Sequence, residues 1–498
     1  MFAIEQKGDF EQARVLMRKL AWTLKAHYRE SGSLQRELTE LLLVLFDKRF
    51  PGFGERNDDL GDLDMLATRV EQWYQQVAVA ALKNYRPGKL ARDTVVLSVG
   101  LGLRAVAQAG VFLIIARLLG SEGYGAFSAA LALAGAWGCF VGLGGQAILI
   151  RDVARDPARF AQSFAASLAI LGLSLPPIGG FYVLSAHWLL PELPWPLLAG
   201  VGLGELVFLP LVNLVACAYQ GFERMGRSAR IQLAPVLTRL AGAGLLVAAA
   251  FRFGGTDDLL LGWAGLYAAA SGLAAWYVIA VARRDLGGPV WAGWRSLREH
   301  LRAGVPFAFL GSAHKLYVDA DKFLLANLST LETAGMYSAG YRFVDLAFLP
   351  LYSLLSAAAP RLFRAGAGGT AGALKGVTSL ALPALGYCLT VAVGLTLLAP
   401  YLPWLLGRDY EDAMTVVRWL AWLPLASLPK LLLHYALATS DAQMRCMAAL
   451  LGGALLNAGL NVWWIPLWGW QGAALATFVA EGAMAVLLLG LMIWSKKK

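Results

Sequence analysis

The chain has 498 residues, of which 58% are hydrophobic and only 15% are charged, and its mean hydropathy is +0.56. Because a soluble protein carries about 25% charged residues, this composition excludes an ordinary soluble enzyme. The formal net charge of +10 is high enough for nucleic-acid binding, but the basic residues gather in loops beside apolar segments, so we expect no nucleic-acid partner. The four cysteines form no CxxC pair. Neither a metal site nor a disulfide framework is therefore indicated, and no cofactor is expected.

The first 90 residues differ from the rest of the chain. At about 11–30, 33–48 and 61–85, apolar residues recur at helical spacing among charged ones. This pattern predicts a small soluble bundle of three helices. The segment contains no nucleophile, metal cluster or phosphate loop, and no apolar stretch typical of a signal peptide. We therefore expect residues 1–90 to form a cytoplasmic accessory domain, and we hypothesise that it docks onto a cytoplasmic partner.

From residue 93 onward the sequence has twelve apolar segments long enough to cross a bilayer, which takes about 20 residues. They are too long for the strands of a β-barrel and do not alternate. The predicted fold class is therefore all-α, a polytopic membrane protein with about 12 transmembrane helices. The approximate spans are 94–116, 123–149, 160–186, 196–219, 231–251, 259–282, 304–326, 334–360, 376–399, 414–438, 446–465 and 472–494.

The loops between these segments predict the orientation of the chain. On one side, the loops and the C-terminal tail contain 18 lysines and arginines, and the other side has only three, Arg117, Arg252 and Arg408. An excess of basic residues over short loops marks the cytoplasmic side. We therefore expect a multi-pass protein of a bacterial inner (plasma) membrane with both termini in the cytoplasm. The basic segment WAGWRSLREHLR at 291–302 is predicted to lie on that membrane surface as an amphipathic helix.

An internal repeat divides the membrane part into two halves. Residues 118–129 and 328–339 are similar at an offset of 210 residues, and both join the first and second spans of a six-helix half. Because both copies start from the same side, the repeat is parallel, with its axis along the membrane normal. This predicts two six-helix lobes, residues 91–303 and 304–498, with a cavity between them. The matching pairs are Leu118 with Leu328, Glu122 with Glu332, Gly125 with Gly335, Phe127 with Tyr337, Ser128 with Ser338, and Ala129 with Ala339.

Twelve ionisable residues fall inside the predicted spans. Each costs about 2.5–3.5 kcal/mol at the centre of a membrane helix, so they must face protein, water or each other. Two of them, Arg418 and Lys430, lie nearer the span ends and are expected to anchor the membrane interface. The residues near the midplane are Arg104, Lys315, Asp345 and Glu481, and the remaining ones are Arg239, Lys322, Arg342, Glu205, Asp319 and Asp321.

The spacing of some of these charges leaves two interpretations open. Lys315 and Asp319 lie one turn apart, and Arg342 and Asp345 share a face of the next span. In the first interpretation they form internal salt bridges. In the second they line a water-filled cavity, where the cations receive an anionic head group and a carboxylate changes protonation. The two overlap, since a carboxylate can be paired in one state and released in another.

Three segments occur in an order that points to a known family. They are RLLGSEGYGAFS at 117–128, DADKFLLANLSTLETAGMYSAGYR at 319–342 and NAGLNVWWIPLWGWQGAALATFVAEG at 457–482. They resemble polysaccharide flippases, the O-antigen type of the multidrug/oligosaccharidyl-lipid/polysaccharide exporter superfamily. The resemblance covers about residues 90–495 and leaves 1–90 unexplained.

This resemblance implies a V-shaped, two-lobed fold with a cationic central cavity. It also implies translocation of undecaprenyl-pyrophosphate-linked oligosaccharide from the cytoplasmic to the periplasmic leaflet, in surface polysaccharide biosynthesis. The lipid bilayer and a coupling ion, a proton or sodium, are the other expected partners.

Depth and charge select the site residues, because the family offers no strict motif to carry over. Cations are needed for a pyrophosphate or acidic sugars, and carboxylates are needed for ion coupling. The substrate-binding candidates are Arg104, Lys315, Arg342 and Arg239. The ion-coupling candidates are Asp319, Asp345, Glu481 and Asp321.

Two other functions compete with the flippase. A cation-coupled multidrug exporter of the same superfamily would favour an acidic cavity, whereas seven of the twelve membrane charges are positive. A membrane-embedded polysaccharide polymerase or acyltransferase would need a nucleophile and a base, often in a long outer loop. The outer loops here are short, the longest at about 400–413, and they carry no such pair. We therefore expect a transporter and not an enzyme.

Overall fold

The computed structural model describes residues 89–253, 259–291, 293–366, 369–438 and 443–496. Within these ranges the regular structure is helical and contains no strand, which confirms the all-α fold class. Residues 93–498 form one compact unit. The accessory domain expected over residues 1–90 falls almost wholly outside the described residues.

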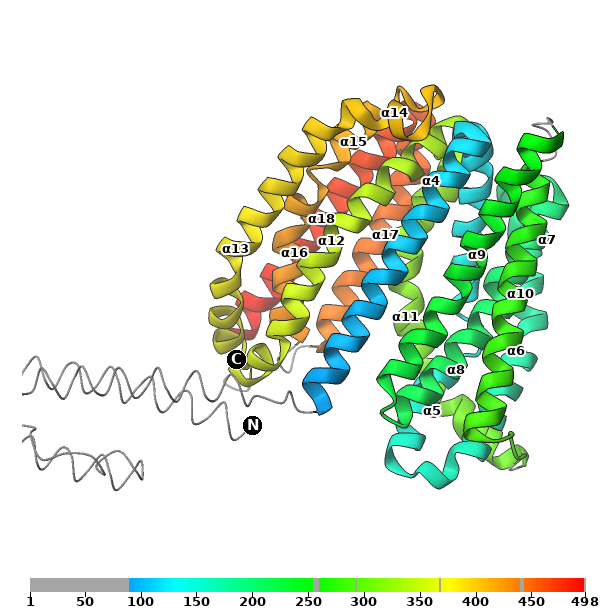
Figure 1. The fold of residues 1–498 in the computed structure, drawn as a ribbon. Coiled ribbons are helices and arrows are strands. Elements are labelled where there is room, and N and C mark those ends of the chain that lie inside the picture. Colours follow the sequence, from blue (N-terminus) through cyan, green and yellow to red (C-terminus); the bar gives the residue numbers. More distant parts are fainter. Residues whose placement is uncertain (1–88, 254–258, 292, 367–368, 439–442, 497–498) are drawn as a thin grey trace, which may run out of the picture. The chain divides into compact units, whose positions relative to one another are not determined.

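The first lobe comprises the elements from α4 to α10; in Figure 1, α5 to α10 are grouped together, and the first segment of α4 is drawn beside α12 and α17. Within it, α9 packs on α8 and α10, and α5 packs on α6 and α8. The side chains of Trp263 and Tyr219 are fully buried in the core that these helices share. The elements are α4 (Lys89–Gly138), α5 (Gly145–Arg155), η1 (Pro157–Arg159), α6 (Phe160–Leu189), α7 (Trp195–Gly202), η2 (Leu203–Phe208), α8 (Leu209–Gly221), α9 (Met225–Phe253) and α10 (Leu259–Leu286).

The second lobe contains the elements from α11 to α18 (Figure 1). Its packing follows the same plan, with α17 against α18 and α11, α13 against α12 and α16, and α16 against α18. The elements are α11 (Trp294–Leu328), α12 (Leu331–Gly366), α13 (Gly369–Leu398), η3 (Ala399–Tyr401), α14 (Leu402–Leu406), η4 (Arg408–Tyr410), α15 (Ala413–Leu420), α16 (Leu423–Ala438), α17 (Gln443–Trp468) and α18 (Trp470–Lys496).

The helices bear out most of the predicted spans. Among the described residues, nine helices are long and apolar enough to cross a membrane. One of them, Gly102–Gly138, covers the first predicted span and part of the second. The seventh and eighth predicted spans correspond to α11 and α12, which have 35 and 36 residues. They are long enough to cross, and their many charged residues lower their hydropathy.

Glycines set the breaks in the first two spans. Gly120 has φ 68° and ψ −178°, and it divides α4 into residues 89–119 and 121–138. The second segment ends at Gly138, eleven residues before the predicted end at 149. Gly142, Leu143 and Gly144 follow with positive φ angles, which a helix cannot contain. The helix starts again as α5, so the second span is broken where it was expected to be continuous.

The two lobes touch through residues that the repeat relates. A Cβ atom on Gly125 would lie 2.8 Å from the backbone nitrogen of Gly335, and one on Gly335 would lie 3.0 Å from that of Gly125. Each glycine also faces a backbone carbonyl of the other lobe, that of Leu331 for Gly125 and that of Ser121 for Gly335. Ser121 and Leu331 are themselves 210 residues apart. This reciprocal contact is what a parallel repeat about a two-fold axis produces.

A tyrosine strengthens the contact at the same end of the lobes. The Tyr410 hydroxyl lies 3.0 Å from the Ala116 carbonyl and 2.9 Å from the Gly120 carbonyl, to which it donates. Burial raises the pKa of the Tyr410 phenol, so it remains a donor at neutral pH. We call this the glycine end of the helices. The other end, beside Arg151, Arg224 and Arg283, is called the basic end.

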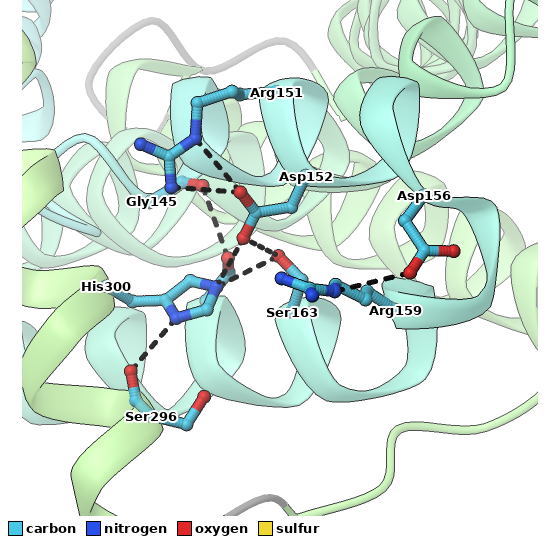
Figure 2. A network of polar contacts seen from close by, with 9 residues as sticks. Gly145, Arg151, Asp152, Asp156, Arg159, Ser163, Ser296 and His300 are labelled. Carbon is cyan, nitrogen blue, oxygen red and sulfur yellow. Dashed lines mark hydrogen bonds and ion pairs between the residues drawn. The ribbon is translucent and has the colours of Figure 1, made fainter.

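At the basic end, α11 is held against the first lobe (Figure 2). His300 Nε2 lies 3.0 Å from Asp152 Oδ2 and 3.0 Å from Ser163 Oγ, so α11 contacts both α5 and α6. His300 Nδ1 lies 2.9 Å from the Ser296 carbonyl. The amphipathic surface helix predicted at 291–302 is therefore wrong as a separate element. From Trp294 onward its residues are the first turns of α11.

Candidate substrate cavity

A cavity of about 720 Å³ lies between the two lobes. Its lining extends from Ser128, one turn past the glycine contact, to Ile150 in α5 near the basic end. The first lobe contributes residues of α4, α5, η2, α8, α9 and α10, and the second contributes residues of α11 and α12. The charged residues of the lining are Arg104, Arg239, Lys322, Arg342, Glu205, Asp319 and Asp345.

Arg239 and Glu205 form an ion pair on the first-lobe wall. Arg239 Nη2 lies 3.1 Å from Glu205 Oε1, and both side chains are largely buried. The Tyr267 hydroxyl donates to the same carboxylate oxygen at 2.6 Å, and the guanidinium carbon of Arg239 lies 4.0 Å from the centre of the Tyr267 ring. Arg239 Nε also donates to Ser271 Oγ at 3.0 Å. The pair is therefore fixed from three sides by the protein.

The local backbone places Glu205 in this wall. It lies in η2, a π-helix of six residues inserted between α7 and α8. Pro210 follows in the first turn of α8, and it has no backbone N–H to donate, so the regular hydrogen-bond ladder is interrupted here. Single π turns widen a helix locally and are frequent at functional sites.

Arg104 differs from the other cavity cations in its partner. Its Nη1 donates to Gln232 Oε1 at 3.2 Å, and Gln232 Nε2 in turn donates to Ser228 Oγ at 3.3 Å. Within the described part of the chain Arg104 makes no ion pair. A neutral amide orients the guanidinium without cancelling its charge. Arg104 therefore adds an uncompensated positive charge to the cavity.

The second-lobe wall presents a mixture of charges. Lys322 Nζ donates to Asp319 Oδ1 at 2.6 Å, one turn apart on α11, and lies 5.0 Å from the centre of the Tyr341 ring. Arg342 and Asp345 line the cavity from α12. The side chain of Lys315, predicted to pair with Asp319 or to bind substrate, lies outside the described residues.

A second polar cluster lies inside the second lobe, away from the cavity lining. The Tyr337 hydroxyl donates to Asp321 Oδ2 at 2.8 Å. Asn461 Nδ2 donates to Asn457 Oδ1 at 3.0 Å, and Asn457 Nδ2 lies 3.5 Å from Thr477 Oγ1. All five residues are buried. Among the described residues, Asp321 Oδ1 and Asn461 Oδ1 have no hydrogen-bond partner. The two sets meet where the Thr477 side chain lies beside the Tyr337 hydroxyl, and each set leaves one buried acceptor oxygen without a donor among the described residues.

Lys430 and Glu481 form a third polar group, also within the second lobe. Lys430 Nζ lies 2.6 Å from Glu481 Oε1, which also accepts a hydrogen bond of 2.6 Å from the Tyr317 hydroxyl. The side chains of Lys430 and Glu481 are 15% and 5% exposed, so the prediction that Lys430 anchors the interface is wrong. Its distance from the span end gave no sign of a partner 51 residues away on another helix.

The structure sorts the eight predicted site residues into three groups. Five line the cavity, two do not, and the side chain of one is not described. The five are Arg104, Arg239, Arg342, Asp319 and Asp345. The two are Asp321 and Glu481, which lie in the separate clusters of the second lobe.

Sequence reasoning left out several residues of the cavity wall. Glu205 and Lys322 were recognised as membrane charges but not selected, although both line the cavity. Gln232 and Tyr267, which hold the two first-lobe arginines, were not considered. Pro210 was the available signal for Glu205, since a proline five residues after a membrane carboxylate indicates an irregular helix.

The fold and the cavity together define a class of protein: a multi-pass helical membrane protein whose two repeated lobes enclose a charged cavity. The chain belongs to the polysaccharide biosynthesis protein family, whose model matches residues 90–365, more than half of the sequence. This match and the fold confirm the resemblance to polysaccharide flippases of the exporter superfamily. Among curated proteins, none matches the sequence significantly.

Solved transporters share the fold. An inward-facing multidrug resistance MATE family transporter of the MOP superfamily has a TM-score of 0.62 at 15% identity, over 81% of this chain and 99% of that chain. A MOP superfamily transporter from Pyrococcus furiosus, described as having a binding pocket of reverse polarity, has a TM-score of 0.55 at 15% identity, over 82% of this chain and 95% of that chain. An outward-facing MATE transporter has a TM-score of 0.52 at 14% identity, over 82% and 96%. At these identities the likeness establishes the fold alone.

Proposed function

We propose that this protein moves an anionic lipid-linked oligosaccharide, carried on undecaprenyl pyrophosphate, from the cytoplasmic to the periplasmic leaflet of a bacterial inner membrane. The observation that carries the proposal is Arg104, a cation without an ion pair among the described residues, facing a cavity between two membrane lobes. Arg104 is partly exposed, so its charge is accessible to an anion, and such a charge-assisted contact is stronger than a neutral hydrogen bond. The partner that fits is an anion brought by the substrate.

The chemistry of the pyrophosphate head group matches the arginines that line the cavity. A pyrophosphate presents several charged oxygens, and a guanidinium binds such oxygens through two parallel hydrogen bonds. Arg104 from α4 and Arg342 from α12 lie on opposite walls of the cavity. An anion held by both would bridge the lobes, and its passage would be coupled to their relative movement. The interaction is stronger here than in water because the surrounding dielectric constant is lower.

The position of the cavity supports alternating access. The lobes contact each other through Gly125 and Gly335 at the glycine end and through His300 of α11 at the basic end, and the cavity lining reaches from one end toward the other. If the basic end is cytoplasmic, as the loop charges predict, we expect substrate to enter beside α11 from the cytoplasmic side. Opening of the Gly125–Gly335 contact would then release it on the other side.

For ion coupling, the buried cluster around Asp321 is the best candidate among the predicted carboxylates. A cation such as sodium is bound by several oxygen ligands, and Asp321 Oδ1 and Asn461 Oδ1 are two buried acceptors without a partner among the described residues. Asn457 and Thr477 add oxygens nearby. Asp319 and Glu481 are each engaged with a lysine, and Asp345 faces the cavity, so these three suit binding or structural roles better.

A multidrug exporter is the second candidate, because the structure with the TM-score of 0.62 is a multidrug resistance transporter. That candidate predicts a net negative cavity for a cationic drug. The described lining has four cations, Arg104, Arg239, Lys322 and Arg342, against the three carboxylates of Glu205, Asp319 and Asp345. The excess is positive and favours an anionic substrate.

The proposal is tested by the sidedness of lipid-linked oligosaccharide in cells depleted of this protein. We expect it to accumulate on the cytoplasmic leaflet, and wild-type protein to restore its outward movement. Arg104→Ala should fail to restore it, because the uncompensated cation is lost. Arg418→Ala is the matched control, since Arg418 is an exposed arginine of α15 outside the cavity lining. Normal sidedness after depletion would contradict the proposal and favour drug efflux.

A further inference from the structure

Three carboxamide side chains on the first-lobe wall have no assigned role. Gln108 of α4, Gln146 of α5 and Asn213 of α8 all line the cavity. Within the described residues, none of the three side chains makes a hydrogen bond to protein. Gln232, by contrast, is hydrogen-bonded to both Arg104 and Ser228. The three are therefore polar groups available to whatever fills the cavity.

Their arrangement is one-sided. The described lining contributed by α11 and α12 contains Asp319, Lys322, Arg342 and Asp345 together with apolar residues, and no carboxamide. On the first lobe, α5 packs directly on α8, so Gln146 and Asn213 come from neighbouring helices. Gln108 lies one helical turn beyond Arg104 on α4. Gln108 thus adjoins Arg104, Gln146 and Asn213 come from two helices in contact, and all three belong to a single lobe.

The chemistry of a carboxamide points to its ligand. Each amide offers two donors and an acceptor but no charge. Such groups suit a ligand with many neutral hydroxyl or acetamido groups, each both donor and acceptor. A phosphate would instead prefer the arginines. A few convergent polar groups of this kind commonly fix the orientation of a ligand in a pocket.

We propose that Gln108, Gln146 and Asn213 form a saccharide subsite, which binds the uncharged sugars of the substrate while the arginines hold its pyrophosphate. This inference rests on the proposed function and adds which residues recognise which part of the substrate. Sugar recognition then belongs to the first lobe, and it uses hydrogen bonds in place of aromatic stacking. The subsite discriminates between a glycosylated lipid and the bare lipid pyrophosphate.

The experiment uses the purified full-length protein in lipid nanodiscs and two probes. One is lipid-linked oligosaccharide extracted from cells depleted of this protein, and the other is undecaprenyl pyrophosphate without sugar. The double variant Gln146→Leu/Asn213→Leu removes two amides while keeping bulk. It should weaken binding of the glycosylated probe about tenfold, because two hydrogen bonds are lost, and leave binding of the bare lipid unchanged. Gln162→Leu, an exposed glutamine of α6 outside the cavity, is the matched control and should change neither.

A third probe separates the sugar from its lipid. The free oligosaccharide, released from the extracted lipid by mild acid, should compete with the glycosylated probe for wild-type protein and compete about tenfold less well for the double variant. Asn213→Ser is a smaller change that keeps a polar group, so it guards against misfolding. Its affinity for the glycosylated probe should lie between the affinities of the wild-type protein and the double variant.

The outcomes distinguish the inference from the proposed function. Equal weakening for both lipid probes, or no weakening for either, would overturn the saccharide subsite and leave the proposed function standing. A wild-type protein that binds neither lipid probe would overturn both. A loss confined to the glycosylated probe supports the subsite.

Discussion

The two lobes repeat one topology but place their polar residues differently. In the first lobe, Arg104, Arg239 and Glu205 face the cavity. In the second lobe, the oxygen-rich cluster around Asp321 and the Lys430–Glu481 pair lie inside the helix bundle. The cost of a membrane charge is the same in both lobes. Both lobes meet that cost at the cavity, where the second lobe contributes Asp319, Lys322, Arg342 and Asp345, and the second lobe also meets it with buried partners inside its bundle.

This difference suggests a division of labour. Groups that face a cavity can exchange their partners for those of a large substrate, whereas groups inside a bundle admit only a small ion. Under the proposed function, Arg104 and Arg342 of the two lobes hold the head group, and the interior of the second lobe binds the coupling ion. Variants that separate stability, ion response and substrate binding test this division.

The largest effect is expected from breaking the buried pair of the second lobe. Lys430→Met leaves the Glu481 carboxylate buried without its cation, which should lower the free energy of unfolding by about 3–5 kcal/mol. The double variant Lys430→Met/Glu481→Met should recover most of this loss, because both charges are then gone. Thermal unfolding in detergent measures both the loss of stability and its recovery. If the single variant is as stable as wild type, the pair does not stabilise the fold, and the result would favour the predicted ion-coupling role of Glu481.

The next effect concerns the ion. Sodium at about 100 times its Kd should stabilise the wild-type protein by about 2.7 kcal/mol, and Asp321→Asn should abolish that shift by removing the charged ligand. Glu205→Gln, which removes a carboxylate from the first-lobe wall, is the control, and this variant should still be stabilised by sodium. Unfolding in matched sodium and potassium buffers provides the measurement. The absence of a sodium effect on wild type would count against a sodium site.

A smaller effect is expected where the lobes meet. Gly335→Val cannot fit, since even a Cβ there would overlap the Ser121 carbonyl oxygen of the first lobe. It should hold the glycine end open and slow transport about tenfold, equivalent to about 1.4 kcal/mol. Gly386→Val is the control, because a Cβ at Gly386 meets nothing within 4 Å.

Native thiols report the change in access at this contact. Cys139 and Cys217 line the cavity, whereas Cys388 and Cys446 are buried. An impermeant maleimide should label the cavity thiols of wild type from the basic end, and those of Gly335→Val from the glycine end. Unchanged labelling would show that the glycine contact does not control access.

The smallest effects come from single tyrosine hydroxyls, one in each lobe. Tyr267→Phe removes the hydrogen bond to Glu205 and keeps the ring beneath Arg239, and Tyr337→Phe removes the hydrogen bond to Asp321. Each should cost about 1 kcal/mol, or about fivefold. The first should change substrate affinity and spare the sodium response, and the second should do the reverse. Identical profiles for both would refute the division between the lobes.

Depth and charge were sufficient to find the membrane charges but not to sort them. Asp319 and Asp321 are two residues apart on α11, which turns a side chain by about 200°. As a result Asp319 lines the cavity and Asp321 faces Tyr337 of α12. The sequence predicted that both were important, yet their roles differ because they point to opposite sides of one helix.

The sequence by itself determined the all-α class, the parallel repeat and the family, because apolar length, loop charge and short motifs are local properties of the chain. It also placed Gly125 and Gly335 at matching positions. Only the tertiary structure decided that these two glycines touch, that Glu205 rather than Glu481 faces the cavity, and that Lys430 is buried. The rotation of each helix about its axis, and its partner across the bundle, are set by packing between distant segments, which no local pattern encodes.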